Sequence, residues 1–414
     1  MYRFLSSTPG RATAASLAAL MLAGPLGPAA TALAAPVIDR SQPAPTPNAD
    51  PDPFYTPPAT IPAGEPGDII RARPAKAGPP TARKLANAWQ VMYLSTNALG
   101  ERDVVTGTIL VPKSGTAANA PLVTFAPGTT GPAFRCTVSR FINSGAFYEQ
   151  AAVNDMLKAG YAIAVTDYEG YHENPETTYV VGRSMGPAVL DAARAATRLP
   201  EAGLAAKPKI AIRGYSQGGG GALWAGELAK TYAPELDLVG VAAGGVPANL
   251  ANVGLNIEGK KAFGVEMTAL IGLDNAYPEL KLADYLLPEA APVFANLEAN
   301  DCTIEIFSDY AGKRAVDYTD PSPLGTIPWL TRIDENALGR QKISVPVLDY
   351  HASDDQVVDF RQALALRTKY CALGMDLQWR TYLGGHITNV GRPNPDVLAW
   401  LGDRFANRPS QPNC

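Results

Sequence analysis

The sequence predicts an α/β fold in which helices flank a mainly parallel sheet, with a helical cap inserted late in the chain. Short apolar segments of strand character alternate with helical segments, as in βαβ units. Residues 209–224 form one such strand–helix pair, joined by the pattern Gly-x-Ser-x-Gly. Residues 246–343 break the alternation and are far longer than the connections of compact α/β units, so this stretch needs a structure of its own.

Residues 1–80 precede the main part of the predicted fold. Residues 1–35 combine a modest basic start, an Ala- and Leu-rich run and a small-x-small pattern at Ala32-Leu33-Ala34, which predicts a secretory signal peptide. Glycines and prolines interrupt the run, which disfavours a transmembrane anchor. Residues 36–80 contain 13 prolines and therefore cannot form a regular helix or a central strand. We expect a Pro-rich N-terminal arm here, either flexible or laid across the surface, with order from about residue 50.

The rest of the chain divides into a predicted core, residues 81–245 and 344–414, and an insertion, residues 246–343. The core elements are a hairpin of 89–96 and 104–111, strands at 121–126, 161–166 and 238–243, strands beginning at 209, 345 and 377, and helices at 189–199, 217–233 and 357–370. The insertion carries apolar helical patches at 262–273 and 285–297. We expect it to form a cap or lid that screens a site from water; the alternative is a helical decoration without a role in access.

Ser216 lies where the strand beginning at 209 passes into the next helix. Gly214 and Gly218 remove side chains that would collide in so tight a turn. The helix amides direct partial positive charge toward the turn, where an oxyanion would form. A serine hydroxyl alone is a weak nucleophile, so this interpretation requires a base and an acid downstream.

An acid and a histidine do follow, each just past the end of a predicted strand. Asp354 and Asp355 follow the strand beginning at 345, and His386 follows the strand beginning at 377. The chain order of serine, acid and histidine is that of α/β-hydrolases, whose sites lie at the carboxyl ends of parallel strands. The pattern does not decide between the two aspartates, because one could instead cap the following helix. Of the other histidines, His351 is interpreted as a structural hydrogen-bonding residue, and His172 has no evident partner.

A second Gly-x-Ser-x-Gly occurs at residues 182–186, centred on Ser184. Only a short apolar run precedes it, and Pro187 follows in what would be the first helical turn. A serine just before a helix that starts with proline is typical of an N-cap. We therefore assign Ser216, and not Ser184, as the candidate nucleophile.

The Gly-rich turn at residues 127–131 follows the predicted strand 121–126. In an α/β-hydrolase this position supplies the second amide of the oxyanion hole, and Thr129 or Thr130 is the expected donor. Gln217 supplies the amide directly after the nucleophile. The alternative is a plain strand-to-loop turn.

Charge and cysteine content limit the other functions. The formal net charge of −4 indicates neither a nucleic-acid partner nor an anionic-membrane surface. Four cysteines in an exported chain predict two disulfides with three possible connectivities, of which we favour Cys136–Cys302 with Cys371–Cys414. None of them forms a Cys-x-x-Cys pattern and histidines are few, so no metal-ligand set is visible.

Taken in order, these motifs resemble those of the secretory lipase family of fungi and actinobacteria. The segments that carry the resemblance are 52–55, 127–131, 167–170, 181–184, 214–219 and the pattern His-Ala-x-x-Asp at 351–355. The resemblance implies an α/β-hydrolase with a helical lid and a triad of Ser216, Asp355 and His386, which selects Asp355 over its neighbour. It also implies that residues 182–184 are scaffold and that a disulfide joins the oxyanion-side loop to the cap.

On this basis the expected function is that of a secreted serine hydrolase that cleaves carboxylic esters of lipid-like substrates, needs no cofactor and contacts a lipid interface transiently through its lid. A peptidase on the same triad is one alternative, with Glu169 and Glu173 as groups that could grip a peptide amine. A hydrolase fold used only as a binding module is another, although an intact triad argues against it.

Overall fold

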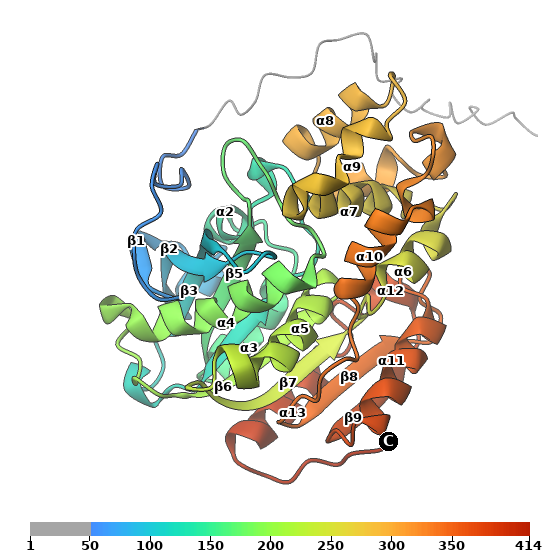
Figure 1. Cartoon of the computed structure of the whole chain (residues 1–414). Coiled ribbons are helices and arrows are strands. Elements are labelled where there is room, and N and C mark those ends of the chain that lie inside the picture. The colour runs from blue at the N-terminus through green and yellow to red at the C-terminus, as the bar shows by residue number, and fades with distance from the viewer. Residues whose placement is uncertain (1–50) are drawn as a thin grey trace, which may run out of the picture. The chain divides into compact units, whose positions relative to one another are not determined.

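The computed structural model describes residues 51–414, and the predicted signal peptide lies outside them. A nine-stranded sheet in the order β1-β2-β3-β5-β4-β6-β7-β8-β9 runs through this part of the chain (Figure 1). The strands are β1 (Ile69–Ala75), β2 (Ala86–Thr96), β3 (Arg102–Pro112), β4 (Leu122–Ala126), β5 (Ala162–Glu169), β6 (Lys209–Tyr215), β7 (Asp237–Gly244), β8 (Val347–Ala352) and β9 (Leu377–Tyr382). The first three are antiparallel to their neighbours, and the strands from β5 to β9 pair in parallel. The predicted α/β fold with a mainly parallel sheet is confirmed.

Helices cover both faces of the sheet, because successive strand side chains point to opposite faces. The flanking helices are α2 (Val138–Ser144), α3 (Gln150–Lys158), α4 (Gly182–Arg198), α5 (Gln217–Tyr232), α11 (Phe360–Ala372) and α13 (Asn394–Phe405). In β6, Ile210 and Ile212 belong to the core under α4, α5 and α11. Ala211 and Tyr215 belong to the opposite core, under α2, α3 and α13. Because the parallel strands are buried on both faces, their sequences are almost continuous apolar runs.

The Pro-rich arm contributes the edge strand β1, which pairs antiparallel with β2. Pro74 is tolerated there because an edge strand leaves one row of amides unpaired. Ahead of β1, the Tyr55 ring packs edge-on against Phe134, and its hydroxyl lies 2.8 Å from Ser139 Oγ. The arm is therefore ordered against the body from its first described residues, but a strand within it was not predicted.

The sequence analysis did not predict helices α2 and α3, and it placed the start of α4 too late in the chain. Helix α2 has seven residues and buries Val138 and Ile142, one i, i+4 pair, which is too short a pattern to detect in the sequence. Helix α4 begins at Gly182, seven residues before the predicted start, so Ser184 and Pro187 lie within it. The N-cap prediction for Ser184 was therefore wrong; Val181 occupies the N-cap position and makes no side-chain cap bond.

The insertion between β7 and β8 is helical and has its own core. Its helices are α6 (Leu250–Ile257), α7 (Phe263–Ala276), α8 (Ala291–Asn300), α9 (Thr303–Ser308) and α10 (Ile327–Glu335), drawn in yellow to orange in Figure 1. Phe263, Leu297 and Trp329 are buried in this core, which also takes Ala98 from the β2–β3 turn and Val181 ahead of α4. We refer to residues 246–343 as the cap.

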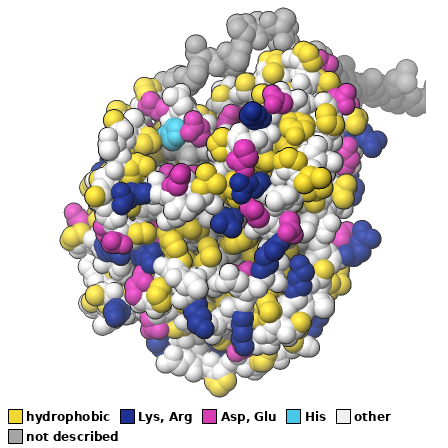
Figure 2. Space-filling view, in the orientation of Figure 1, with side chains coloured by type: hydrophobic (Ala, Val, Ile, Leu, Met, Phe, Trp, Pro, Cys, Tyr) yellow, Lys and Arg dark blue, Asp and Glu magenta, His cyan; other side chains and the backbone are white. Residues whose placement is uncertain are grey.

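Surface charge is mixed on the face drawn in Figure 2, where basic and acidic side chains are both scattered among apolar ones. Such a surface produces no extended field of one sign. Within residues 51–414, no helix has the length and apolarity needed to cross a bilayer.

Candidate active site

Ser216 occupies a strained turn between β6 and α5. Its backbone has φ +58° and ψ −122°, a conformation that non-glycine residues seldom adopt. A Cβ on Gly214 would lie 2.0 Å from the carbonyl oxygen of Gly218, and a Cβ on Gly218 would lie 2.0 Å from that of Ala126. Both glycines are therefore required by backbone contacts, and together they hold the serine out at the end of β6.

His386 connects Ser216 to Asp355 through two hydrogen bonds. Its Nε2 lies 2.8 Å from Ser216 Oγ, and its Nδ1 lies 2.6 Å from Asp355 Oδ2. His386 is 3% exposed and Asp355 is 9% exposed, so water hardly competes for these bonds. A neutral imidazole would donate from Nδ1 and accept the serine proton at Nε2, which is the arrangement a general base needs.

The two candidate aspartates have different partners. Asp355 accepts the amides of Val357 and Val358 on Oδ1, at 2.9 and 2.8 Å, which leaves Oδ2 for His386. Asp354 instead accepts the amides of residues 384 and 385 and holds the loop that carries His386. Neither aspartate caps α11, because that helix begins at Phe360 with the Asp359 side chain as its cap.

The other two histidines lie outside this hydrogen-bonded chain. The His351 Nε2 lies 2.8 Å from the carbonyl oxygen of Val358, as expected for a structural residue, and 3.5 Å from Asp355 Oδ2. Burial lowers the pKa of its imidazole. Burial also lowers the pKa of His172, which lies in the loop after β5 and does not line the cavity beside Ser216.

The turn at residues 127–131 lies next to Ser216. The Gly128 amide donates to Glu149 Oε1 at 2.8 Å, and burial raises the pKa of that carboxyl to about 7. Thr129 lines the cavity together with Ser216 and Gln217, whereas Thr130 does not. Of the two threonines, Thr129 is therefore the one that borders the space beside Ser216.

The cap also holds this turn, a feature that the sequence pattern did not reveal. The Thr303 hydroxyl donates to the Thr129 carbonyl at 2.7 Å, and the Thr303 amide donates to the Thr130 carbonyl at 3.0 Å. These bonds join residues more than 170 positions apart, so no local signal could have predicted them.

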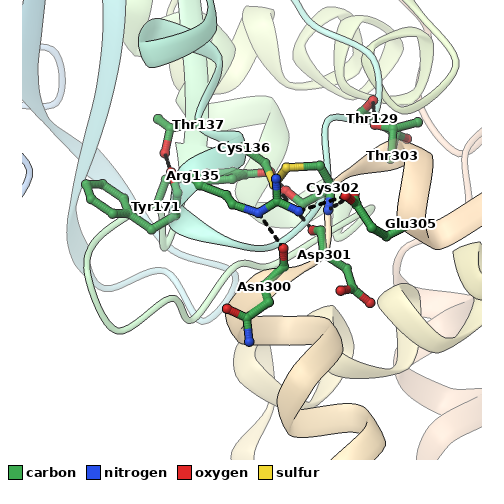
Figure 3. Close-up of a disulfide and its surroundings, with 12 residues drawn as sticks. Thr129, Arg135, Cys136, Thr137, Tyr171, Asn300, Asp301, Cys302, Thr303 and Glu305 are labelled. Atoms are coloured by element: carbon green, nitrogen blue, oxygen red, sulfur yellow. Dashed lines mark hydrogen bonds and ion pairs between the residues drawn. A yellow bond between two sulfur atoms is a disulfide. The ribbon is translucent and has the colours of Figure 1, made fainter. Parts of the chain in front are cut away.

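A disulfide lies next to the same junction (Figure 3). Cys136 is bonded to Cys302, the residue before Thr303, and closes a sequence separation of 166. Arg135 extends past the disulfide to the cap, where it donates to the Asn300 carbonyl at 2.6 Å and pairs with Glu305 at 2.9 Å. The second disulfide joins Cys371 to Cys414, so the structure contains both of the favoured pairs.

Removing the first disulfide is expected to impair the site more than removing the second. In a Cys136→Ser/Cys302→Ser variant we expect a loss of about 3 kcal/mol of unfolding free energy. We also expect about a tenfold fall in kcat/KM for esters, because the turn at 127–131 loses its covalent link to the cap. Activity assays and thermal unfolding check this, with Cys371→Ser/Cys414→Ser as the matched control. Equal losses of activity in the two variants would contradict the proposed link.

Ser184, the centre of the second Gly-x-Ser-x-Gly, is 1% exposed and lies 2.5 Å from the Thr178 hydroxyl. A Cβ on Gly182 would lie 2.0 Å from Nε1 of Trp224 in α5. The glycine of this second motif therefore serves close packing of α4 against α5, and Ser184 does not line the cavity beside Ser216.

Ser216 opens into a cavity of about 390 Å³ between the sheet and the cap. Polar side chains line the end near the serine, with the Tyr179 hydroxyl 2.7 Å from Thr129 Oγ1. The cap side is mostly aliphatic: its lining includes Leu250, Val253, Ile257, Leu270, Leu273 and Leu324. A volume of this size accepts a small ester or part of an aliphatic chain. Across residues 51–414, no cluster of His, Cys, Asp and Glu has the arrangement of a metal site.

The sequence matches found among known proteins belong to lipases. The family described as "Secretory lipase" matches residues 139–413. Lipase 6 of Candida albicans is 27% identical over 389 residues, covering 88% of this chain and 83% of that protein. A secreted triacylglycerol lipase of Malassezia globosa is 28% identical over 383 residues, covering 88% and 81%. A probable inactive lipase of Mycobacterium tuberculosis is 28% identical over 374 residues, covering 86% and 82%.

Solved structures share the fold. The crystal structure of Candida antarctica lipase A superposes with a TM-score of 0.79 at 22% identity, covering 88% of this chain and 87% of that one. The cell wall degrading esterase LipA of Xanthomonas oryzae superposes with a TM-score of 0.68 at 18% identity, covering 83% and 99%. At these identities the likeness establishes an α/β-hydrolase architecture and not a substrate.

Proposed function

The chain belongs to the secretory lipase family, and on that premise we propose that it is a secreted serine hydrolase that cleaves carboxylic esters of lipid-like substrates, triacylglycerols among them. The observation that carries the proposal is the hydrogen-bonded chain from Ser216 through His386 to Asp355, which opens into a largely aliphatic cavity. The name of the Malassezia relative and the disulfides of this chain support secretion.

In the proposed mechanism, Ser216 Oγ attacks the ester carbonyl while His386 Nε2 takes its proton. Asp355 holds the imidazole in orientation and stabilises its positive charge. The amides of Thr129 and Gln217 bind the oxyanion of the tetrahedral intermediate, with the Thr303 bonds from the cap fixing the position of Thr129. His386 then protonates the leaving alcohol, and a water molecule repeats the sequence on the acyl-enzyme.

The exposed rim of the cavity supports contact with a lipid surface. Leu255, Ile304 and Ile387 are 73%, 80% and 60% exposed. Ile387 lines the cavity, and the other two adjoin the lining residues Gly254 and Thr303. We propose that these side chains touch the lipid aggregate from which the ester enters.

The peptidase alternative has little geometric support. Glu169 accepts a hydrogen bond from Thr178, and neither Glu169 nor Glu173 lines the cavity beside Ser216. A site for a peptide amine would need such a carboxylate within reach of the nucleophile.

The proposal predicts that the wild-type protein hydrolyses p-nitrophenyl esters and is labelled by an alkyl fluorophosphonate on Ser216. A series from C2 to C16 would show whether activity extends to long acyl chains, as the aliphatic cavity predicts, and peptide mapping would locate the label. Denatured protein is the labelling control. Folded protein that neither cleaves any ester nor takes the label would refute the proposed activity and support the binding-module alternative, to which the probable inactive relative also points.

A further inference from the structure

One acidic side chain lies in the aliphatic part of the cavity. Glu266, on α7, lines it and is 5% exposed. It is the only Asp, Glu, Lys or Arg among the cavity-lining residues that the structure describes. Buried carboxyl groups are normally paired or hydrogen-bonded, so this one calls for an explanation.

One of the two carboxyl oxygens of Glu266 lacks a hydrogen-bond partner within residues 51–414. Its Oε2 is buried and accepts no hydrogen bond, and the carboxyl makes no ion pair. On α6 the carboxyl lies near Gly254, where an added Cβ would be 3.6 Å from both Cδ and Oε2 of Glu266. Because Gly254 has no side chain, α6 offers the carboxyl no hydrogen-bonding group at this point. The mechanism proposed above does not use Glu266.

The surroundings keep the carboxyl protonated below about pH 7. Burial, reinforced by the nearby negative charge of Glu258, raises the pKa of Glu266 to about 7. The other residues that line the cavity on α7 are Val265, Ala269, Leu270 and Leu273, which offer neither hydrogen bonds nor charge. A protonated carboxyl has one O–H donor and free acceptor positions, and an alcohol has the same complement. A bound ammonium group would instead require an ion pair among aliphatic walls, with the desolvation of both charges.

We propose that Glu266 is a specificity-determining residue that hydrogen-bonds a hydroxyl group on the aliphatic chain of the substrate, so that hydroxylated esters are preferred to plain ones. This inference rests on the proposed ester hydrolysis and names a substrate class for the same cavity. The hydroxyl can belong to the acyl chain or to the alcohol chain of the ester. The two arms of the experiment below distinguish these two cases.

The first arm of the test compares p-nitrophenyl dodecanoate with its monohydroxy derivatives, which carry one hydroxyl at each position from C3 to C12. The second arm uses acetate monoesters of α,ω-diols against alkyl acetates of equal length. We expect one hydroxyl position in the first arm, or one diol length in the second, at which kcat/KM exceeds that of the neighbouring compounds by about tenfold or more. The position of the maximum would give the distance from Ser216 to the carboxyl along the chain.

Substitutions at Glu266 then test the cause of that maximum. Glu266→Leu is expected to reduce kcat/KM for the preferred hydroxy ester by about 10- to 100-fold, because its hydroxyl is then buried without a partner, while the plain ester loses little. Glu266→Gln keeps donor and acceptor groups and should retain most of the preference. Leu270→Met, an apolar change on the same helix, should alter both esters alike.

The outcomes separate this inference from the proposed function. If plain esters are cleaved but no hydroxylated isomer is preferred, or if Glu266→Leu changes all esters equally, the carboxyl is only a buried structural group and the inference is wrong. Amino-substituted dodecanoates are assayed beside the hydroxylated ones, and a preference confined to them would also overturn the inference, in favour of cation binding. If no ester is cleaved at all, the proposed function fails and the inference fails with it.

Discussion

Substituting Ser216 by alanine is expected to reduce kcat for p-nitrophenyl ester hydrolysis by about 10³-fold or more, with little change in stability. The hydroxyl is the proposed nucleophile, and nothing else in the hydrogen-bonded chain can form the acyl-enzyme. Steady-state kinetics against an alkyl ester that the wild type cleaves, with circular dichroism to verify folding, checks this.

The matched control is Ser184→Ala, which removes the serine of the second Gly-x-Ser-x-Gly. That hydroxyl is buried against Thr178 and away from the cavity, so activity should stay within a few-fold of wild type. Asp355→Asn should cost about 10⁴-fold, because an amide favours the wrong tautomer of His386. Combining it with Ser216→Ala should cost no more than the serine change alone, since triad residues act as a unit. An inactive Ser184→Ala beside an active Ser216→Ala would refute the assignment.

Asp349→Asn is expected to stabilise the protein at neutral pH by about 4 kcal/mol. Asp349 lies within β8 and is 1% exposed, and neither carboxylate oxygen has a hydrogen-bond partner within the described residues. Burial raises the pKa of this carboxyl from 3.8 to about 8, against a smaller opposing effect of Arg367. Each pH unit between these two values corresponds to about 1.4 kcal/mol, which gives the figure at pH 7.

The sign of this pH dependence follows from the number of protons that the folded and unfolded states bind. Between pH 4 and 8 the folded protein retains a proton on Asp349 that the unfolded chain has released, so the unfolding free energy of the wild type falls as the pH rises. The asparagine variant does not titrate there, so the difference between the two proteins should be near zero at pH 4 and grow up to pH 8. Urea unfolding at intervals of one pH unit measures it.

A suitable control for this pH dependence is Asp359→Asn. Arg361 lowers the pKa of the Asp359 carboxyl, so this change should have the opposite sign and be small, as is usual for a solvent-screened pair. A difference between wild type and Asp349→Asn that stays constant from pH 4 to 8 would contradict the prediction.

Much of the fold could be predicted from local patterns. Apolar runs and strand–helix alternation predicted the hairpin β2–β3, the parallel strands and the helix after Ser216. The parallel strands are recognisable because a strand that is buried on both faces has a continuous apolar sequence. The elements that were not predicted have weaker apolar patterns in the sequence. Strand β1 lies in a Pro-rich segment, and α2 has only one buried i, i+4 pair.

The candidate site was predicted to a similar extent. Turn chemistry marks Ser216, since Gly214 and Gly218 are dictated by backbone contacts within a few residues or on an adjacent strand. Chain order selected His386, and the family resemblance selected Asp355 over Asp354. The structure brings Ser216, His386 and Asp355 within hydrogen-bond distance, and their catalytic role remains the proposal tested above.

By itself, the sequence determined the sheet class, the strained serine turn and the presence of an inserted cap. These features depend on residue periodicity, glycine sterics and loop length, all of which act locally along the chain. Tertiary structure alone decided that Thr129 rather than Thr130 lines the cavity, that Thr303 holds their carbonyls, and that Glu266 lines an aliphatic space with its Oε2 unpartnered. Those features depend on contacts between segments far apart in the chain, and packing of the whole chain sets such contacts.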